Sequence, residues 1–92
     1  MSGKVTRDLP IINIKGLHAR ASAKFVDLVE RHDAQAIVEK DGLSVSGDSI
    51  MGLLMLTAPR GSVIRVTTSG PDASQLADAL EALVSDYFGE GM

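Results

Sequence analysis

A two-residue turn, Asp41-Gly42, stands in the middle of the stretch QAIVEKDGLSVSG, residues 35–47. Aspartate followed by glycine favours a type I′ turn, because both central residues of that turn need a positive φ. Such a turn joins neighbouring antiparallel strands, so the segment predicts a β-hairpin. Apolar and polar side chains alternate on its second strand, and this period of two predicts that Leu43 and Val45 face a core.

Two further segments are rich in β-branched residues and predict the rest of the sheet. Residues 5–14, VTRDLPIINI, contain Pro10, which has no N–H to donate to a sheet, so we expect this strand at a sheet edge. Residues 62–69, SVIRVTTS, predict the last strand, after a break at residues 58–61.

Three segments predict helices between and after these strands. Residues 19–32 carry apolar side chains at helical period. Residues 49–56, SIMGLLML, predict a short helix with Ser49 as its N-cap, and Gly70-Pro71-Asp72 begins the last helix. The expected core faces are Ala21, Phe25, Leu28, Val29 and His32 in the first helix and Leu76, Leu80, Leu83, Val84 and Tyr87 in the last.

The order β-α-β-β-α-β-α predicts an α+β open-faced sandwich, in which a four-stranded antiparallel sheet carries three helices on one face. A chain of 92 residues is expected to form a single domain over residues 1–92. With two Phe, one Tyr and no Trp, its core must be mainly aliphatic.

The composition also argues against several functions. The chain has no cysteine, which excludes disulfides and thiolate chemistry. A net charge of −3 without a basic run argues against nucleic-acid binding. No apolar run is long enough to cross a bilayer and no signal peptide precedes the first strand, so we expect a cytoplasmic protein without membrane insertion.

The stretch GLHARAS places His18 at the expected start of the first helix, where it has several interpretations. It is a turn residue, a metal ligand, a general base or the site of a covalent intermediate. On one helix, His18 and His32 are about 21 Å apart at 1.5 Å per residue, so they cannot share a metal ion. The sequence also lacks a G-x-S-x-G turn and a phosphate-binding G-x-x-x-x-G-K-[ST] loop, and we expect neither a metal nor a cofactor.

The residues around His18 suit a phosphohistidine. An imidazole with an ordinary pKa of about 6.5 is largely neutral at pH 7, and a ring nitrogen can accept a phosphoryl group. The helix that begins at Ala19 presents free N–H groups and the positive end of its dipole to an anion. Arg20 adds a planar set of donors suited to phosphate oxygens, although local spacing alone does not exclude a structural histidine.

The motif GLHARASAKFVDLV, followed by DSIMGLLML, resembles HPr, the family of histidine-containing phosphocarriers of the phosphoenolpyruvate-dependent phosphotransferase system. The resemblance covers about residues 5–88 and includes both motifs, their separation and the order of elements. It implies that His18 accepts a phosphoryl group from enzyme I on Nδ1 and passes it to an enzyme IIA domain, with Arg20 assisting. The partners supply the catalysis, so the resemblance implies a carrier and not an enzyme.

One position departs from the family's usual pattern. The family usually has proline after the arginine, and this chain has Ala21. Alanine is a good helix former, so we expect the helix to persist with a looser first turn. The N–H group that proline lacks becomes available, and Ala19 and Ala21 are then expected to help stabilise phosphate at the helix start.

The second motif implies a regulatory site and a docking patch. In some branches of the family, an HPr kinase/phosphorylase phosphorylates the serine that corresponds to Ser49, and a phosphate is favoured at a helix N-terminus. The alternative is that Ser49 serves only as an N-cap. The resemblance also implies that Ile50, Met51 and Leu54 form the apolar patch that docks enzyme I and enzyme IIA.

Two alternatives to a phosphocarrier stay open at this level. One is a regulatory HPr-like binding protein that acts through phosphorylated Ser49, although the presence of His18 argues against it. The other is an α+β module that binds a small ligand without covalent chemistry. The sequence does not decide between a sugar-uptake branch and a nitrogen-related regulatory branch.

Overall fold

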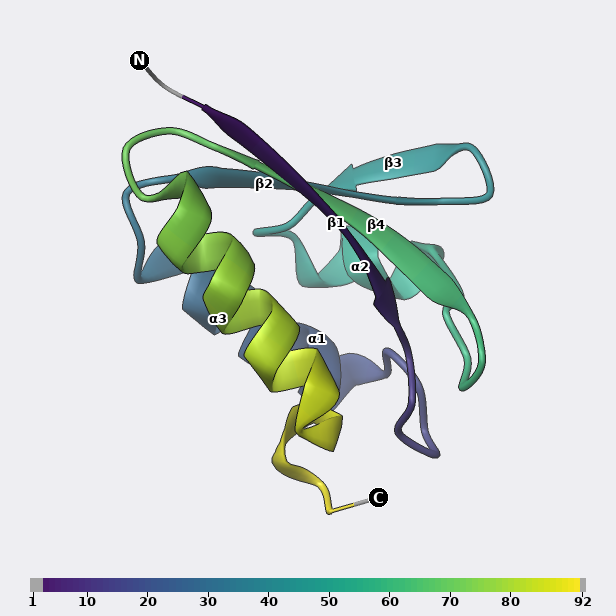
Figure 1. The fold of residues 1–92 in the computed structure, drawn as a ribbon. Coiled ribbons are helices and arrows are strands. Elements are labelled where there is room, and N and C mark those ends of the chain that lie inside the picture. Colours follow the sequence, from purple (N-terminus) through teal and green to yellow (C-terminus); the bar gives the residue numbers. More distant parts are fainter. Residues whose placement is uncertain (1–2, 92) are drawn as a thin grey trace.

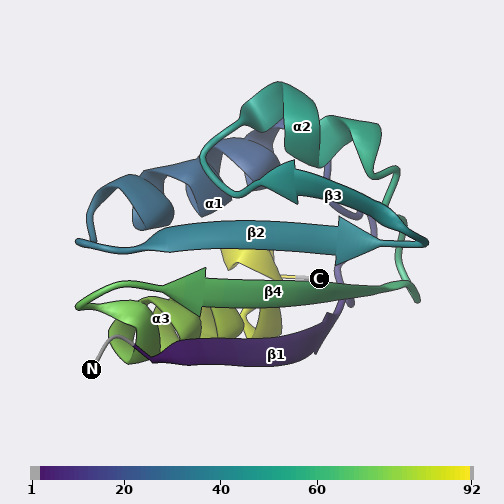
Figure 2. The same cartoon turned by 90° about the horizontal axis from the view of Figure 1, so that it is seen from above.

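Four strands form one antiparallel sheet in the order β1-β4-β2-β3 (Figure 2). The structure is a computed structural model and describes residues 3–91. The strands are β1 Lys4–Pro10, β2 Gln35–Lys40, β3 Leu43–Ser46 and β4 Val63–Ser69. As Pro10 predicts, β1 lies at an edge of the sheet.

Three α-helices cover one face of this sheet (Figure 1). They are α1 Ala19–Glu30, α2 Ile50–Met55 and α3 Ala73–Ser85, and a short 3-10 helix, η1 Tyr87–Gly89, follows α3. The order β-α-β-β-α-β-α and the single helical layer confirm the predicted α+β open-faced sandwich.

Alternate strand residues point toward the helices and build a mainly aliphatic core. On β2, Val38 is fully buried, whereas its neighbour Ile37 is 47% exposed on the opposite face. The largest fully buried apolar side chains are Phe25, Phe88, Ile11, Leu53, Ile64, Leu76, Leu80, Val38, Val66 and Val84. Burying one side chain of this size contributes roughly 1.5–3 kcal/mol to folding.

The predicted hairpin is present, but one of its two core residues is not buried. Asp41 and Gly42 both have positive φ, 52° and 83°, which confirms the type I′ geometry. Val45 packs against the core and lies close to Gly52 of α2, where an added Cβ would come within 3.0 Å of the valine Cβ. The prediction of a buried Leu43 is wrong, because this residue adjoins the turn of an edge hairpin and is 41% exposed.

Strand β1 is shorter than predicted. Its pairing with β4 ends at Pro10 opposite Val63, where β4 begins. Residues 11–14 therefore leave the sheet as a loop, and this loop leads to the start of α1. Within this loop, the Asn13 side chain donates a 2.9 Å hydrogen bond to the Gly16 carbonyl oxygen, close to the start of α1.

The two long helices also end earlier than their apolar stripes predict. His32 lies beyond the end of α1, where its Nδ1 is 2.7 Å from the Leu28 carbonyl oxygen. Tyr87 is 37% exposed and is not part of the core face of α3, whereas Phe88 is fully buried. Both residues have positive φ, so the chain turns there. As a result, Phe88 enters the core in place of the predicted Tyr87.

Candidate functional site

His18 occupies the N-cap position of α1, directly before the first helical residue. Its backbone is extended, with φ −81° and ψ −177°, and its carbonyl oxygen accepts a 2.8 Å hydrogen bond from the Ser22 N–H. The backbone of His18 thus closes the first helical turn. The imidazole is left to make other contacts.

The loop before His18 packs closely against the segment that follows α2. Gly16 has φ 66°, and a Cβ atom there would lie 2.5 Å from the Ala58 carbonyl oxygen. Leu17 is buried and donates its N–H to the same oxygen at 2.9 Å. Glycine is required for this approach, so the residue pair before the histidine determines where the imidazole lies.

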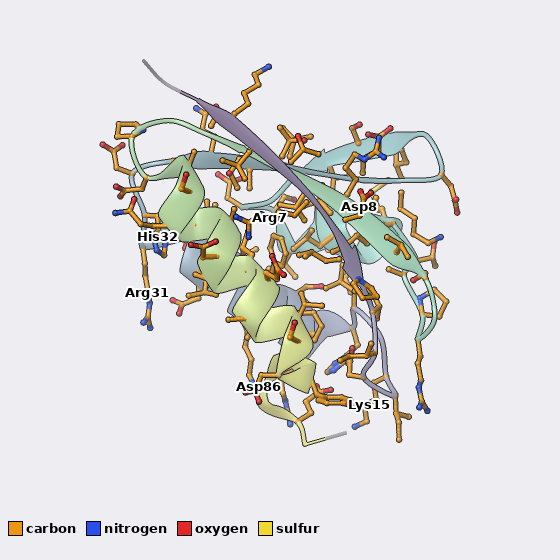
Figure 3. All side chains as sticks on the ribbon, in the orientation of Figure 1. Arg7, Asp8, Lys15, Arg31, His32 and Asp86 are labelled. Atoms are coloured by element: carbon orange, nitrogen blue, oxygen red, sulfur yellow. The ribbon has the colours of Figure 1, made fainter. Side chains whose placement is uncertain are left out.

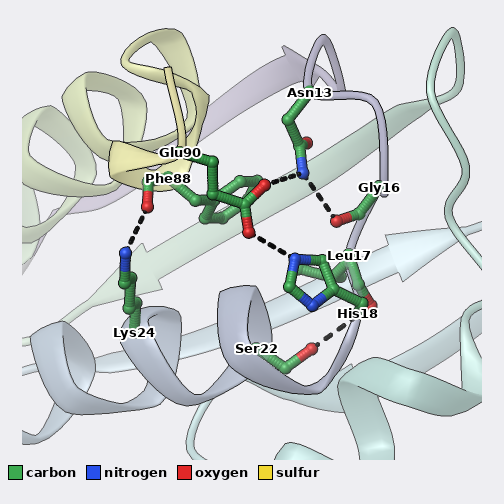
Figure 4. Close-up of polar contacts among 8 residues, drawn as sticks. All are labelled: Asn13, Gly16, Leu17, His18, Ser22, Lys24, Phe88 and Glu90. Carbon is green, nitrogen blue, oxygen red and sulfur yellow. Dashed lines mark hydrogen bonds and ion pairs between the residues drawn. The ribbon is translucent and has the colours of Figure 1, made fainter. Parts of the chain in front are cut away.

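The His18 imidazole contacts a carboxylate from the last residues of the chain (Figure 4). Its Nε2 lies against Oε2 of Glu90, and Oε1 of the same carboxylate accepts a 2.9 Å hydrogen bond from Asn13 Nδ2. Asn13 is fully buried, and its Nδ2 also donates to the Gly16 carbonyl oxygen at 2.9 Å. These three side chains, His18, Asn13 and Glu90, form the His–Asn–Glu cluster.

Glu90 carries a negative charge at neutral pH. Its side chain is 16% exposed, and this burial by itself raises the pKa of the carboxyl group. Hydrogen bonds from Asn13 and His18, with the nearby charge of Lys15, outweigh burial and lower the pKa of Glu90 below its ordinary value of 4.5. The cluster therefore sets a carboxylate against one nitrogen of the imidazole.

The start of α1 offers donors beside His18. The N–H groups of Ala19, Arg20 and Ala21 belong to the first helical turn and have no partner inside the helix. Arg20 is exposed. It lines a pocket of about 410 Å³ with Ile14, Lys15, Lys24, Gly89 and Glu90. The positive helix end and these basic side chains suit an anion.

Ala21 does not interrupt the helix at the position where the family usually has proline. It is the third residue of α1, its side chain is fully buried, and it belongs to the hydrophobic core. The expectation that the helix persists is confirmed. Whether the first turn is looser in solution stays a prediction.

The short helix α2 begins at Ser49, as its sequence predicts. The Ser49 Oγ accepts a 3.0 Å hydrogen bond from the Gly52 N–H, which is the geometry of an N-cap. Leu53 and Leu56 are buried and hold the helix against the core. The opposite side of the helix is open to solvent.

That open side carries most of the apolar residues assigned to docking. Ile50 is 39% exposed, Met51 is 69% exposed and Leu54 is half-buried. Met55 is 63% exposed and extends the same surface. We refer to Ile50, Met51, Leu54 and Met55 as the apolar patch.

The apolar patch reaches the histidine through Leu54. A surface pocket of about 470 Å³ is lined by Lys15, Leu17, His18, Leu54, Thr57, Ala58 and Pro59. The structure thus brings α2 and the start of α1 to one side of the molecule. A partner that covers α2 would also cover the imidazole.

The second histidine lies elsewhere. Figure 3 shows His32 and Arg31 at the opposite end of the helical layer from Lys15, which precedes His18 by three residues. Within residues 3–91, no three His, Cys, Asp or Glu side chains are grouped in a way that would hold a metal ion. Over the same residues, none of the helices combines the length and apolar character needed to cross a bilayer.

Three residues of the site were missed from the sequence. Met55 follows Met51 at helical spacing, so the exposed stripe of α2 was detectable. Asn13 was assigned to a strand. Glu90 gave no local signal, because its contact with His18 joins residues 72 positions apart.

Comparison with known proteins places this chain and its fold among the phosphocarriers. The HPr-C-His structure from Thermoanaerobacter tengcongensis superposes with a TM-score of 0.88 at 37% identity, over 98% of this chain and 99% of that one. The phosphocarrier protein HPr of Cupriavidus necator is 47% identical over 85 residues, covering 92% of this chain and 96% of the relative. The phosphocarrier protein NPr of Shewanella violacea is 38% identical over 87 residues, covering 95% and 96%.

The family model described as "PTS HPr component phosphorylation site" matches residues 5–86. The chain therefore belongs to the HPr family, the phosphocarriers of the phosphotransferase system.

Proposed function

We propose that His18 carries the phosphoryl group, which it accepts from phospho-enzyme I and passes to an enzyme IIA domain. The observation that carries this proposal is the position of the imidazole. One ring nitrogen, Nε2, lies against Glu90, and the ring stands at the N-terminus of α1 (Figure 4). This leaves Nδ1 as the nitrogen that attacks phosphorus.

The start of α1 supports the phosphorylated state. The N–H groups of Ala19 and Ala21 lie in the first turn of the helix, and together with the positive end of the helix dipole they would stabilise phosphate oxygens. Arg20 supplies an exposed guanidinium at the same helix end, able to pair with the dianion during transfer. The carrier itself needs no cofactor for this step, and we place it in the cytoplasm, where its partners act.

Labelling with phosphoenolpyruvate and enzyme I tests the role of His18. We expect the protein to gain one acid-labile phosphate, because a phosphate on nitrogen is lost in acid whereas a phosphate on serine is not. The His18→Ala variant should gain none, and His32→Ala should be labelled like the unaltered protein. Labelling of His18→Ala at the unaltered level would assign the phosphate to another residue.

The apolar patch is proposed as the surface that docks enzyme I and enzyme IIA. Exposed methionine side chains adapt to differently shaped partners, and Met51 and Met55 are the most exposed members of the patch. The patch adjoins the pocket that contains His18. Docking there would remove water from the imidazole at the moment of transfer.

The acceptor branch is a separate question. Relatives named HPr and one named NPr both match over most of this chain, so the proposal includes a sugar-uptake and a nitrogen-related branch. Transfer rates from the phosphorylated protein to enzyme IIA domains of each branch would separate them. The faster acceptor identifies the branch.

We also propose that an HPr kinase/phosphorylase phosphorylates Ser49. The Ser49 Oγ lies at the N-terminus of α2, where the helix dipole favours a phosphate, and directly before the apolar patch. Added negative charge there would hinder docking of the partners. Treatment with this kinase and ATP should give an acid-stable phosphate that is absent in Ser49→Ala and retained in Ser44→Ala, an exposed serine of β3.

The regulatory alternative makes a different prediction from the carrier. A protein that acts only through phosphorylated Ser49 would take no phosphate from enzyme I. A small-ligand module would take none from either donor. The two labelling experiments therefore distinguish all three functions.

A further inference from the structure

The segment after α3 turns back over the start of α1 and carries Glu90 to the site. We refer to residues 86–90 as the C-terminal strap. Tyr87 and Phe88 within it have φ of 57° and 54°, a left-handed conformation that residues with a β-carbon adopt rarely. Two consecutive residues of this kind persist only where the surrounding structure holds them.

Two contacts hold the strap in this conformation. The Phe88 side chain is fully buried in the core, and its carbonyl oxygen accepts a 2.6 Å hydrogen bond from Lys24 Nζ on α1 (Figure 4). The strap is thus attached to the same helix that His18 caps. Its geometry leaves Glu90 directed at the imidazole.

Asn13 fixes the carboxylate from the other side. Its Nδ2 donates to Glu90 Oε1 and to the Gly16 carbonyl oxygen, while its buried Oδ1 has no hydrogen-bond partner among residues 3–91. Both neighbours are acceptors, so the amide keeps this orientation although its own oxygen stays unpaired.

The charge state of Glu90 determines which nitrogen of His18 carries the proton. An ionised carboxylate only accepts hydrogen bonds. The nitrogen in contact with it, Nε2, must then be the protonated one, and the neutral ring keeps its lone pair on Nδ1. This is the same division of labour by which a buried carboxylate orients the histidine of a hydrolase triad.

We propose that Glu90 is a positioning residue for phosphoryl transfer, which holds the proton on Nε2 so that Nδ1 is the nucleophile and stabilises the positive ring that forms. The inference rests on the proposed function of His18. In the step, the Nδ1 lone pair forms the bond to phosphorus, and the bond from phosphorus to the donor breaks with its electron pair left on the donor. The His18 ring keeps its Nε2 proton and becomes an imidazolium that faces the carboxylate.

Imidazole ¹⁵N chemical shifts of the unphosphorylated protein test the first half of this inference. At neutral pH, we expect neutral His18 to be protonated mainly on Nε2. Glu90→Ala should increase the fraction protonated on Nδ1. Glu90→Gln should do the same, because the new carbonyl oxygen pairs with Asn13 and the NH2 group then faces Nε2 as a donor. Unchanged tautomer populations in Glu90→Ala would overturn the inference.

The rate of phosphorylation by phospho-enzyme I tests the second half. We expect a loss of about tenfold for Glu90→Ala, the size of one hydrogen bond to a charged group, and a loss of similar size for Glu90→Gln, which removes the charge that faces the imidazolium. Asp86→Asn removes an exposed carboxylate of the same strap and should leave both readouts unchanged. Equal rates for all three variants would overturn the role in transfer.

These readouts separate two kinds of failure. If His18 is never phosphorylated, the proposed function fails, yet the ¹⁵N spectra still report whether Glu90 sets the tautomer. If His18 is phosphorylated and neither the tautomer nor the rate depends on Glu90, the carrier function stands and the positioning role does not. A variant that unfolds would be recognised by its circular dichroism, and Glu90→Gln, which preserves shape, then decides the outcome.

Discussion

The two nitrogens of the His18 ring have different surroundings, and this difference comes from single residues. Glu90, near the C-terminus, contacts Nε2 of the ring. Gly16 allows the loop before His18 to approach Ala58, and this approach determines where the ring lies. Glu90 acts on the imidazole by direct contact, whereas Gly16 acts through the position of the loop that carries His18. Predictions at this scale therefore concern Gly16 and Glu90.

Gly16→Ala should destabilise the protein and displace His18. The new Cβ would meet the Ala58 carbonyl oxygen at 2.5 Å, so the loop must move, at a cost of about 1–3 kcal/mol. Urea unfolding measures the loss, and phosphorylation by enzyme I should fall with it. Gly42→Ala is the matched control, since its φ is also positive but no heavy atom lies within 4 Å of the added Cβ. An equal loss of stability in both variants would show that the Ala58 contact is unimportant.

The charge of Glu90 predicts a dependence of stability on pH. Its pKa in the folded protein is lowered below 4.5, so near that pH the unfolded chain binds more protons than the folded one. Stability from this group is then fully present above its unfolded pKa and is lost as the pH falls through the folded pKa. Thermal unfolding should be measured from about pH 3 to about pH 7, a range that spans both pKa values of Glu90. The melting temperature should depend less steeply on pH in Glu90→Gln than in the unaltered protein. Parallel curves would contradict the prediction.

At the scale of elements, α2 is a helix of six residues with two different faces. Leu53 is fully buried and holds the helix to the core, whereas Met51 is 69% exposed on the apolar patch. A helix this short has little stability of its own, so its buried face keeps it in place and its open face is available for partners.

The two faces of α2 should separate stability from docking. Leu53→Ala should destabilise the protein by about 2–5 kcal/mol, because it leaves a cavity in the core. Met51→Ala should change stability by less than about 0.5 kcal/mol. It should, however, raise the KM of enzyme I for this protein as the phosphoryl acceptor. Ile37→Ala removes a similarly exposed side chain from the opposite face of the sheet and should leave that KM unchanged. A raised KM in Ile37→Ala would locate docking elsewhere.

At the scale of the whole molecule, the core and the site are joined at Phe88. Its ring is fully buried, and its carbonyl oxygen accepts a hydrogen bond from Lys24. Phe88 precedes Glu90 of the His–Asn–Glu cluster by two residues. The hydrophobic core and the C-terminal strap thus meet at one aromatic side chain. A change in the core there is expected to reach the imidazole.

Phe88→Ala should affect both stability and the proton on His18. Loss of a buried phenyl ring costs about 3–5 kcal/mol, which urea unfolding would measure. Because the strap loses its anchor, the ¹⁵N shifts of His18 should also move toward those of Glu90→Ala. Leu76→Ala, an equally buried side chain of α3, should lower stability without this spectral change. A His18 spectrum that stays unaltered in Phe88→Ala would separate the strap from the core.

Most of the fold was predictable because its signals are local. The Asp41-Gly42 turn, the Ser49 cap and the apolar stripes of α1 and α3 each depend on residues a few positions apart. The errors lie at element ends, such as the strand that stops at Pro10 and the exposure of Leu43 and Tyr87. Ends depend on which partner strand or layer is present, and this information is not local.

The sequence by itself determined the order of elements, the place of His18 at a helix start and the cap of α2, since these follow from backbone preferences of neighbouring residues. Only the tertiary structure decided what faces the imidazole. Asn13 and Glu90 reach His18 because β1 ends at Pro10 and because Tyr87 and Phe88 turn the chain through a left-handed conformation that core packing holds. No periodicity or motif encodes a contact across 72 positions, so the carboxylate at the histidine became visible only in the folded chain.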